Sequence, residues 1–253
     1  MRRLVLAALV LTAFPLSAET DTRQEIIDWT VIAGAGAGGA ALNYAPYLTD
    51  RPVVGGSTDR SYRGDTVPLF WVAGGCGAAG LSIALCPNTD GQLNETAYVH
   101  IKGFSAAMAF NALFTNLAKT AVGRKRPDYD ARPDGREGRK SFYSGHASFS
   151  FAAATYLSLY AINDTALGSD CGFFPKIAVP SILYSAAAAV AASRVNDHRH
   201  HISDVVVGAA AGSLTAYGAY IWAERRLSRA LPQLAVAYEE GKPVVSATVT
   251  IPF

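Results

Sequence analysis

Three short clusters of polar residues, each where an apolar segment meets a loop, carry the side chains best suited to chemistry. The first contains Lys119 and Arg126, seven residues apart, with Pro127 directly after them. Seven residues make about two helical turns, so we expect both cations to project from one helix face until Pro127 ends the helix. Two cations on one face suit an oxyanion, although a solvated basic loop would have the same composition.

The second cluster runs from Ser141 to His146 and ends with Ser144-Gly145-His146, directly before an apolar segment. Backbone N–H groups at a helix N-terminus bind anions, and a glycine there allows close approach. Ser144 would add a hydroxyl and His146 a titratable proton. The plainer alternative is that Ser144 only caps the helix and that His146 is a surface residue.

The third cluster precedes the last apolar segment and contains Arg194, His200 and Asp204. His200 and Asp204 are four residues apart, so on a helical turn the carboxylate is expected to accept the Nδ1 proton and to leave Nε2 pointing outwards. A nucleophilic or basic imidazole needs this arrangement. His198 and His201 flank His200 in the sequence. The three histidines could instead bind a metal ion, although no cysteine lies nearby to serve as a further ligand.

Six Ala- and Gly-rich apolar segments position these clusters. They lack strict alternation and are too long for strands, so we expect one all-α bundle within residues 19–230. In its third segment, His100 and Lys102 are expected to form a polar edge. In residues 231–253, alternating apolar residues on both sides of a polar turn predict a short C-terminal β-hairpin. The six segments cover approximately residues 26–48, 66–86, 98–118, 147–163, 177–194 and 204–223.

The composition limits the class of protein. The chain has 253 residues, of which 50% are hydrophobic and 17% charged, and its formal net charge is +2 at pH 7. This apolar content excludes a disordered chain, and so small a charge excess gives no support for a nucleic-acid partner. The length suits a single domain.

The first 18 residues resemble a secretory signal. Two arginines and the apolar run Leu4–Leu16 precede the small pair Ser17-Ala18. The run is too short to cross ~30 Å of hydrocarbon, which disfavours a first transmembrane helix. Export would take the bundle to a bacterial periplasm, where Cys86 and Cys171 could form a disulfide.

Taken together, the three clusters carry a resemblance that no one of them carries alone. Lys119, six residues and Arg126-Pro127, then Ser144-Gly145-His146, then Arg194, five residues, His200, three residues and Asp204 resemble the signature of the type 2 phosphatidic acid phosphatase and vanadium haloperoxidase superfamily. The resemblance spans about residues 100 to 222 and implies that superfamily's helical bundle.

The resemblance also implies a role for each residue. His200 would attack phosphorus and form a phosphohistidine, with Asp204 orienting its ring, and His146 would protonate the leaving group. The resemblance implies no metal and no cofactor. The residues that would hold the phosphate oxygens are Lys119, Arg126, Ser144, Gly145 and Arg194.

Residues 138–150 resemble the lipid phosphate phosphatase branch, although Tyr143 stands where the superfamily often has proline. The expected function is metal-independent hydrolysis of phosphomonoesters, with phosphatidate, lysophosphatidate or diacylglycerol pyrophosphate as substrates. The alternatives are a soluble periplasmic acid phosphatase acting on small phosphomonoesters, a vanadium-dependent haloperoxidase, and a helical protein whose histidine loop binds a metal.

The sequence leaves the relation to the membrane between two possibilities. A mean hydropathy of +0.17 is low for a chain half inside a bilayer. Together with the signal, it favours a soluble or peripheral periplasmic bundle at the membrane surface. The uncharged stretch Thr66–Thr89 is long enough to span, and the lipid phosphatase resemblance favours the alternative, a multi-pass inner-membrane protein.

Overall fold

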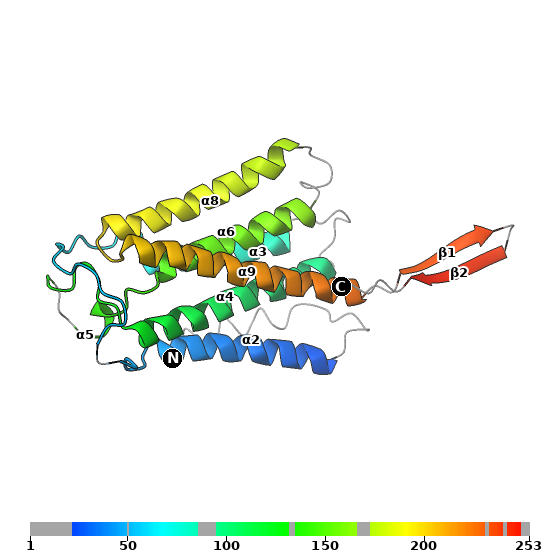
Figure 1. The fold of residues 1–253 in the computed structure, drawn as a ribbon. Coiled ribbons are helices and arrows are strands. Elements are labelled where there is room, and N and C mark those ends of the chain that lie inside the picture. Colours follow the sequence, from blue (N-terminus) through cyan, green and yellow to red (C-terminus); the bar gives the residue numbers. More distant parts are fainter. Residues whose placement is uncertain are drawn as a thin grey trace.

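The computed structural model describes residues 22–49, 51–85, 95–131, 135–165, 173–230, 233–239 and 242–248. Up to residue 230, the described residues fold as six long helices and a one-turn helix, which confirms the predicted all-α bundle and all six predicted segments (Figure 1). The helices are α2 (Thr22–Leu42), α3 (Leu69–Leu85), α4 (Glu95–Val122), the short α5 (Gly135–Gly138), α6 (Gly145–Asn163), α8 (Phe173–Asn196) and α9 (Ile202–Ala230).

Helices α4, α6 and α9 form the centre of the bundle. α2 packs on α4, α8 packs on α6, and α3 lies against both α4 and α6. Small residues bring α9 close to α6, because a Cβ on Gly212 would lie 2.0 Å from the Ser148 carbonyl oxygen and one on Gly208 would lie 2.6 Å from that of Ser144. This close contact places the first turn of α9 beside the first turn of α6.

Helix α4 ends at Val122, before Pro127 could end it. Gly123 adopts a positive φ of 58° and its N–H bonds to the Lys119 carbonyl oxygen at 3.1 Å, which is a glycine C-cap. The helix therefore stops before Pro127, and Arg126 lies in the following loop. The expectation that Lys119 and Arg126 share one helix face is wrong, because the glycine ends the helix before the proline can.

The expected polar edge at His100 and Lys102 is also wrong. Their exposed fractions are 0% and 2%. The Lys102 ammonium pairs with Glu25 at 2.5 Å and with Asp28 at 3.1 Å, two acids on α2. These charged groups can be buried at this end of the bundle because each is paired with an opposite charge.

Much of the outer surface is apolar. α8 (Phe173–Asn196) and the segment Ile202–Leu227 of α9 are long and apolar enough to cross a membrane. On α8, Phe173 and Phe174 are 78% and 80% exposed, and on α3 Trp71 is 67% exposed. The structure therefore holds two candidate membrane spans.

The C-terminal tail contains strands β1 (Gln233–Glu239) and β2 (Lys242–Thr248), which pair antiparallel. The turn residues 240–241 are outside the described residues, so the complete hairpin stays a prediction. The predicted signal in residues 1–18 and the cysteines Cys86 and Cys171 are also outside the described residues.

Candidate active site

The three polar clusters meet at one end of the bundle. The end of α4, the start of α6, the end of α8 and the start of α9 gather there with the loops that connect them, at the left of Figure 1. The positive charges of Arg126, Lys119 and Arg194 all act on His200, and those of Arg194 and Lys119 act on His146. The Ser144 N–H donates to the Asp204 carbonyl oxygen at 3.0 Å. The structure thus brings the predicted residues of all three clusters together.

His200 is oriented by a backbone carbonyl. Its Nδ1 lies 2.7 Å from the carbonyl oxygen of Ser141, whereas Asp204 Oδ2 is 4.0 Å from the same nitrogen. The expected hydrogen bond to Asp204 is therefore not formed. α9 begins only at Ile202, so His200 precedes the helix and the four-residue spacing does not correspond to a helical turn. Donation from Nδ1 to a carbonyl leaves the Nε2 lone pair free for chemistry.

Asp204 reaches His200 only through Ser141. The buried carboxylate accepts hydrogen bonds from Arg124 Nη1 at 2.5 Å, from Ser141 Oγ at 2.5 Å and from the His201 backbone N–H at 3.0 Å. Asp204 therefore fixes the residue whose carbonyl holds the His200 ring. Arg124 and Ser141 lie within the first and second clusters, but sequence reasoning gave them no role. A basic run does not show which cation faces an anion, and a serine in a loop carries no signal of its own.

Two of the predicted phosphate-binding cations pair with carboxylates, one on the short helix α5 and one in the loop before α3. Arg126 Nη2 pairs with Glu137 Oε2 at 2.9 Å, and Arg194 Nη2 pairs with Asp65 Oδ1 at 2.8 Å. The acidic partners are 56% and 41% exposed, whereas both guanidinium groups are buried. An incoming phosphate would compete with exposed, weakly held carboxylates for buried cations.

The start of α6 provides a site for an anion. Ser144 is the N-cap, and its hydroxyl accepts from the Ala147 N–H at 3.5 Å, as the capping alternative predicts. A Cβ on Gly145 would lie 3.4 Å from Lys119 Nζ. The positive end of the helix and an ammonium group therefore face the same space.

Burial and nearby cations lower the pKa values of three ionisable groups in the site. Burial and the charges of Arg194 and Lys119 lower the pKa of His146 to about 4, and burial with Arg126 and Lys119 holds the pKa of His200 well below its usual value. Burial and Arg126 lower the pKa of Lys119 to about 8. His146 Nε2 is buried without a hydrogen-bond partner among the described residues. A bound anion would offset the repulsion between these groups.

The other two loop histidines hold the loops in place. His198 Nδ1 lies 2.8 Å from the Ser61 carbonyl oxygen, and His201 Nε2 lies 3.2 Å from that of Lys125. Within the described part of the chain, they do not come together with His200 as a group of metal ligands.

The chain is similar to a known protein family and to several known proteins. The PAP2 superfamily matches residues 102–228. The chain is 39% identical over 117 residues to a PA-phosphatase related-family protein of Dictyostelium discoideum, covering 44% of this chain and 43% of the relative. It is 36% identical over 141 residues to lipid phosphate phosphatase 1 of Arabidopsis thaliana, covering 47% and 43%.

A third relative is the probable diacylglycerol pyrophosphate phosphatase 1 of Schizosaccharomyces pombe, which is 33% identical over 132 residues, covering 43% of this chain and 47% of the relative. The chain spans less than half the length of these three relatives. No solved structure matches the chain.

Proposed function

The chain belongs to the PAP2 superfamily, and from that premise we propose that it is a phosphatase that releases phosphate from phosphorylated lipids. One observation carries the proposal: two histidines with lowered pKa values lie among three cations at a helix N-terminus. Phosphoryl transfer depends mostly on such positioning and charge stabilisation.

In the proposed reaction, His200 Nε2 attacks phosphorus in line with the ester bond. The P–N bond forms as the P–O bond breaks, and His146 gives a proton to the departing alkoxide. Water then attacks the phosphohistidine, its proton passes to His146, and the P–N bond breaks to release phosphate. Lys119, Arg126 and Arg194 stabilise the charge on the three equatorial oxygens.

His146 can act as a general acid only when bound substrate raises its pKa. With a pKa of about 4 in the empty site, its ring is neutral near pH 7. The negative charge of a bound phosphate raises that pKa, because it offsets Arg194 and Lys119. Protonation of His146 is thereby coupled to substrate binding.

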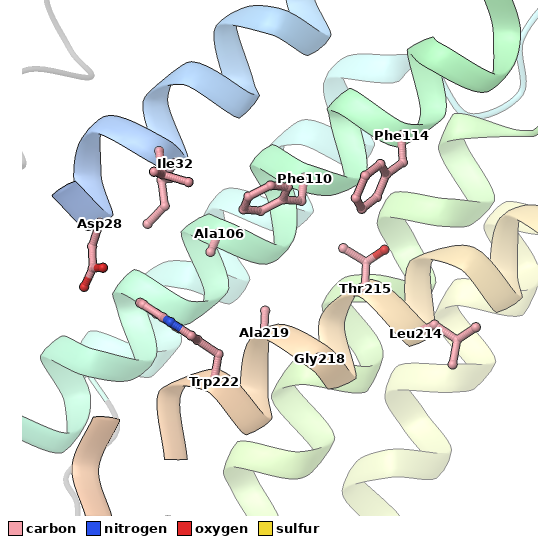
Figure 2. A pocket seen from close by; sticks show the side chains of 11 residues that line it. Asp28, Ile32, Ala106, Phe110, Phe114, Leu214, Thr215, Gly218, Ala219 and Trp222 are labelled. Atoms are coloured by element: carbon pink, nitrogen blue, oxygen red, sulfur yellow. The ribbon is translucent and has the colours of Figure 1, made fainter. Parts of the chain in front are cut away.

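The apolar surface supports a lipid as the substrate. A crevice of about 460 Å³ opens between α2, α4 and α9, and its lining is almost entirely apolar, from Asp28 and Trp222 at one end to Phe114 and Leu214 at the other (Figure 2). We propose that the bundle is held in a membrane, with α8 and α9 as spans, and that the active site lies at one bilayer surface. We propose that residues 1–18 form a signal, residues 19–230 the helical domain and residues 231–253 a hairpin tail. A periplasmic site in a spanning bundle requires the start of α2 to lie on the cytoplasmic side, because α2 begins at the end of the bundle opposite the site.

The test measures phosphate release by the purified full-length protein from phosphatidate in mixed micelles and from soluble nitrophenyl phosphate. His200→Ala is expected to abolish release, and His146→Ala to reduce it ~10²- to 10⁴-fold. His198→Ala is the matched control and should keep full activity. Faster hydrolysis of phosphatidate than of the nitrophenyl ester supports the lipid assignment. Full activity in the His200 variant would contradict the proposed nucleophile.

A further inference from the structure

A second cluster of ionisable side chains lies at the opposite end of the bundle. His100 is near the start of α4, Asp164 directly follows α6, and Glu224 is in the last turns of α9. These helix ends lie together at the right of Figure 1. The phosphatase mechanism uses none of the three residues.

The three side chains are spaced like the ligands of a metal ion. His100 Nε2 lies 3.1 Å from Glu224 Oε1 and 3.5 Å from Asp164 Oδ2, and one ligand atom from each residue lies within 4.8 Å of the other two. Ligand atoms ~2.1 Å from an ion, at angles of ~90 to ~110°, are ~3.0 to ~3.4 Å apart. The two nitrogen–oxygen distances therefore leave room for a cation between them.

Hydrogen bonds with the Tyr156 hydroxyl determine which ring nitrogen of His100 carries the lone pair. The Tyr156 hydroxyl donates its proton to the His100 carbonyl oxygen at 3.1 Å, so its own oxygen accepts from His100 Nδ1–H at 3.2 Å. In the neutral ring, Nε2 then carries the lone pair and points at two carboxylates. Metal-binding histidines are held in the same way, by a hydrogen bond from the other ring nitrogen.

Two buried atoms of the cluster face each other without the geometry of a hydrogen bond. His100 is fully buried, and neither its Nε2 nor Glu224 Oε1 makes a hydrogen bond among the described residues, although the two atoms are only 3.1 Å apart. If the imidazole is neutral, the Asp164 and Glu224 carboxylates, whose side chains are 11% and 39% exposed, face a fully buried ring with no positive charge between them. Such an arrangement is costly without a compensating cation. A divalent ion would satisfy both atoms and both charges.

We propose that His100, Asp164 and Glu224 bind a divalent transition-metal ion, which ties together the ends of α4, α6 and α9. One imidazole and two carboxylates suit Zn²⁺, whereas Mg²⁺ prefers oxygen ligands alone. The Tyr220 hydroxyl donates to Asp164 Oδ2 at 2.8 Å and orients that ligand. The Glu224 side chain is 39% exposed, which gives the ion a path from solvent. The role is structural and separate from the phosphatase reaction.

The test titrates Zn²⁺ into full-length protein in detergent after removal of metals with a chelator. We expect one Zn²⁺ per chain, a higher melting temperature with Zn²⁺ present, and no competition from Mg²⁺. Tyr156→Phe should weaken Zn²⁺ binding ~10- to 100-fold, because it removes the acceptor that holds Nδ1–H. Glu224→Gln, which keeps the side-chain shape, should weaken it further.

His198→Gln is the matched control and should bind Zn²⁺ like the original protein. A loss of Zn²⁺ in that variant would assign the ion to the loop histidines and overturn the proposal. Equal binding by the original protein and Glu224→Gln would also overturn it, because Glu224 would then not be a ligand of the ion. None of these measurements depends on phosphate release. Failure of the proposed metal site is therefore distinct from failure of the proposed phosphatase function.

Discussion

The buried ion pair behind the nucleophile offers a quantitative test of the site. Arg124 Nη1 and Asp204 Oδ1 are 2.5 Å apart, and their side chains are 8% and 0% exposed. Asp204→Asn preserves the shape and one acceptor but leaves the Arg124 guanidinium without its counter-charge. Removal of one partner from a buried pair costs ~3 to 5 kcal/mol. At ~2 to 4 °C per kcal/mol for a domain of this size, the melting temperature should fall by ~6 to 20 °C.

The assay is thermal unfolding of the full-length protein in detergent, followed by the helical circular dichroism signal. Glu137→Gln is the matched control, because it makes the same acid-to-amide change in a pair whose carboxylate is 56% exposed. Because water already reaches the Glu137 carboxylate, the control should lower the melting temperature by less than Asp204→Asn does.

Arg124→Met and the double variant complete a mutant cycle for the same pair. Each single change leaves the other partner of the pair unsatisfied. The loss of unfolding free energy in the double variant should therefore be smaller than the sum of the two single losses by at least ~1 kcal/mol. Equal shifts for Asp204→Asn and Glu137→Gln, or additive effects in the cycle, would refute the buried-pair reasoning.

Three further predictions concern the site and its support. Because an anion raises the pKa of His146 from about 4, sulfate binding near pH 6 should take up protons, measured by calorimetry in buffers of different ionisation enthalpy; His146→Gln should take up fewer, and equal uptake would contradict the coupling. Gly212→Ala should cost ~1 to 3 kcal/mol by thermal unfolding, because its Cβ would lie 2.0 Å from a carbonyl oxygen of α6, whereas Gly218→Ala has no atom within 4 Å and should not destabilise. Asp65→Asn should lower KM for phosphatidate by up to ~5-fold, because it removes the exposed carboxylate that pairs with Arg194 Nη2 and leaves only the pair with the buried Asp197; an unchanged or higher KM would count against competition.

The helices were predictable because their signal is local. Long apolar stretches rich in alanine and glycine predict helices whatever their neighbours, and all six fall where expected. The helix ends were less predictable. Gly123 and Pro127 both can stop α4, and only the folded chain shows that the glycine does so first. Likewise, Lys102 reads as a surface residue until its two acidic partners on α2 are known.

The sequence alone determined which residues form the candidate site, since their types and spacing in three clusters already pointed to one phosphate pocket. Only the tertiary structure decided how those residues are held. The carbonyl of Ser141 orients His200 where a helical Asp204 was expected, and Arg124 is used to neutralise Asp204. Spacing along the chain specifies contacts only within a helix, whereas these contacts join segments about 60 to 80 residues apart, whose approach depends on the packing of α4, α6 and α9.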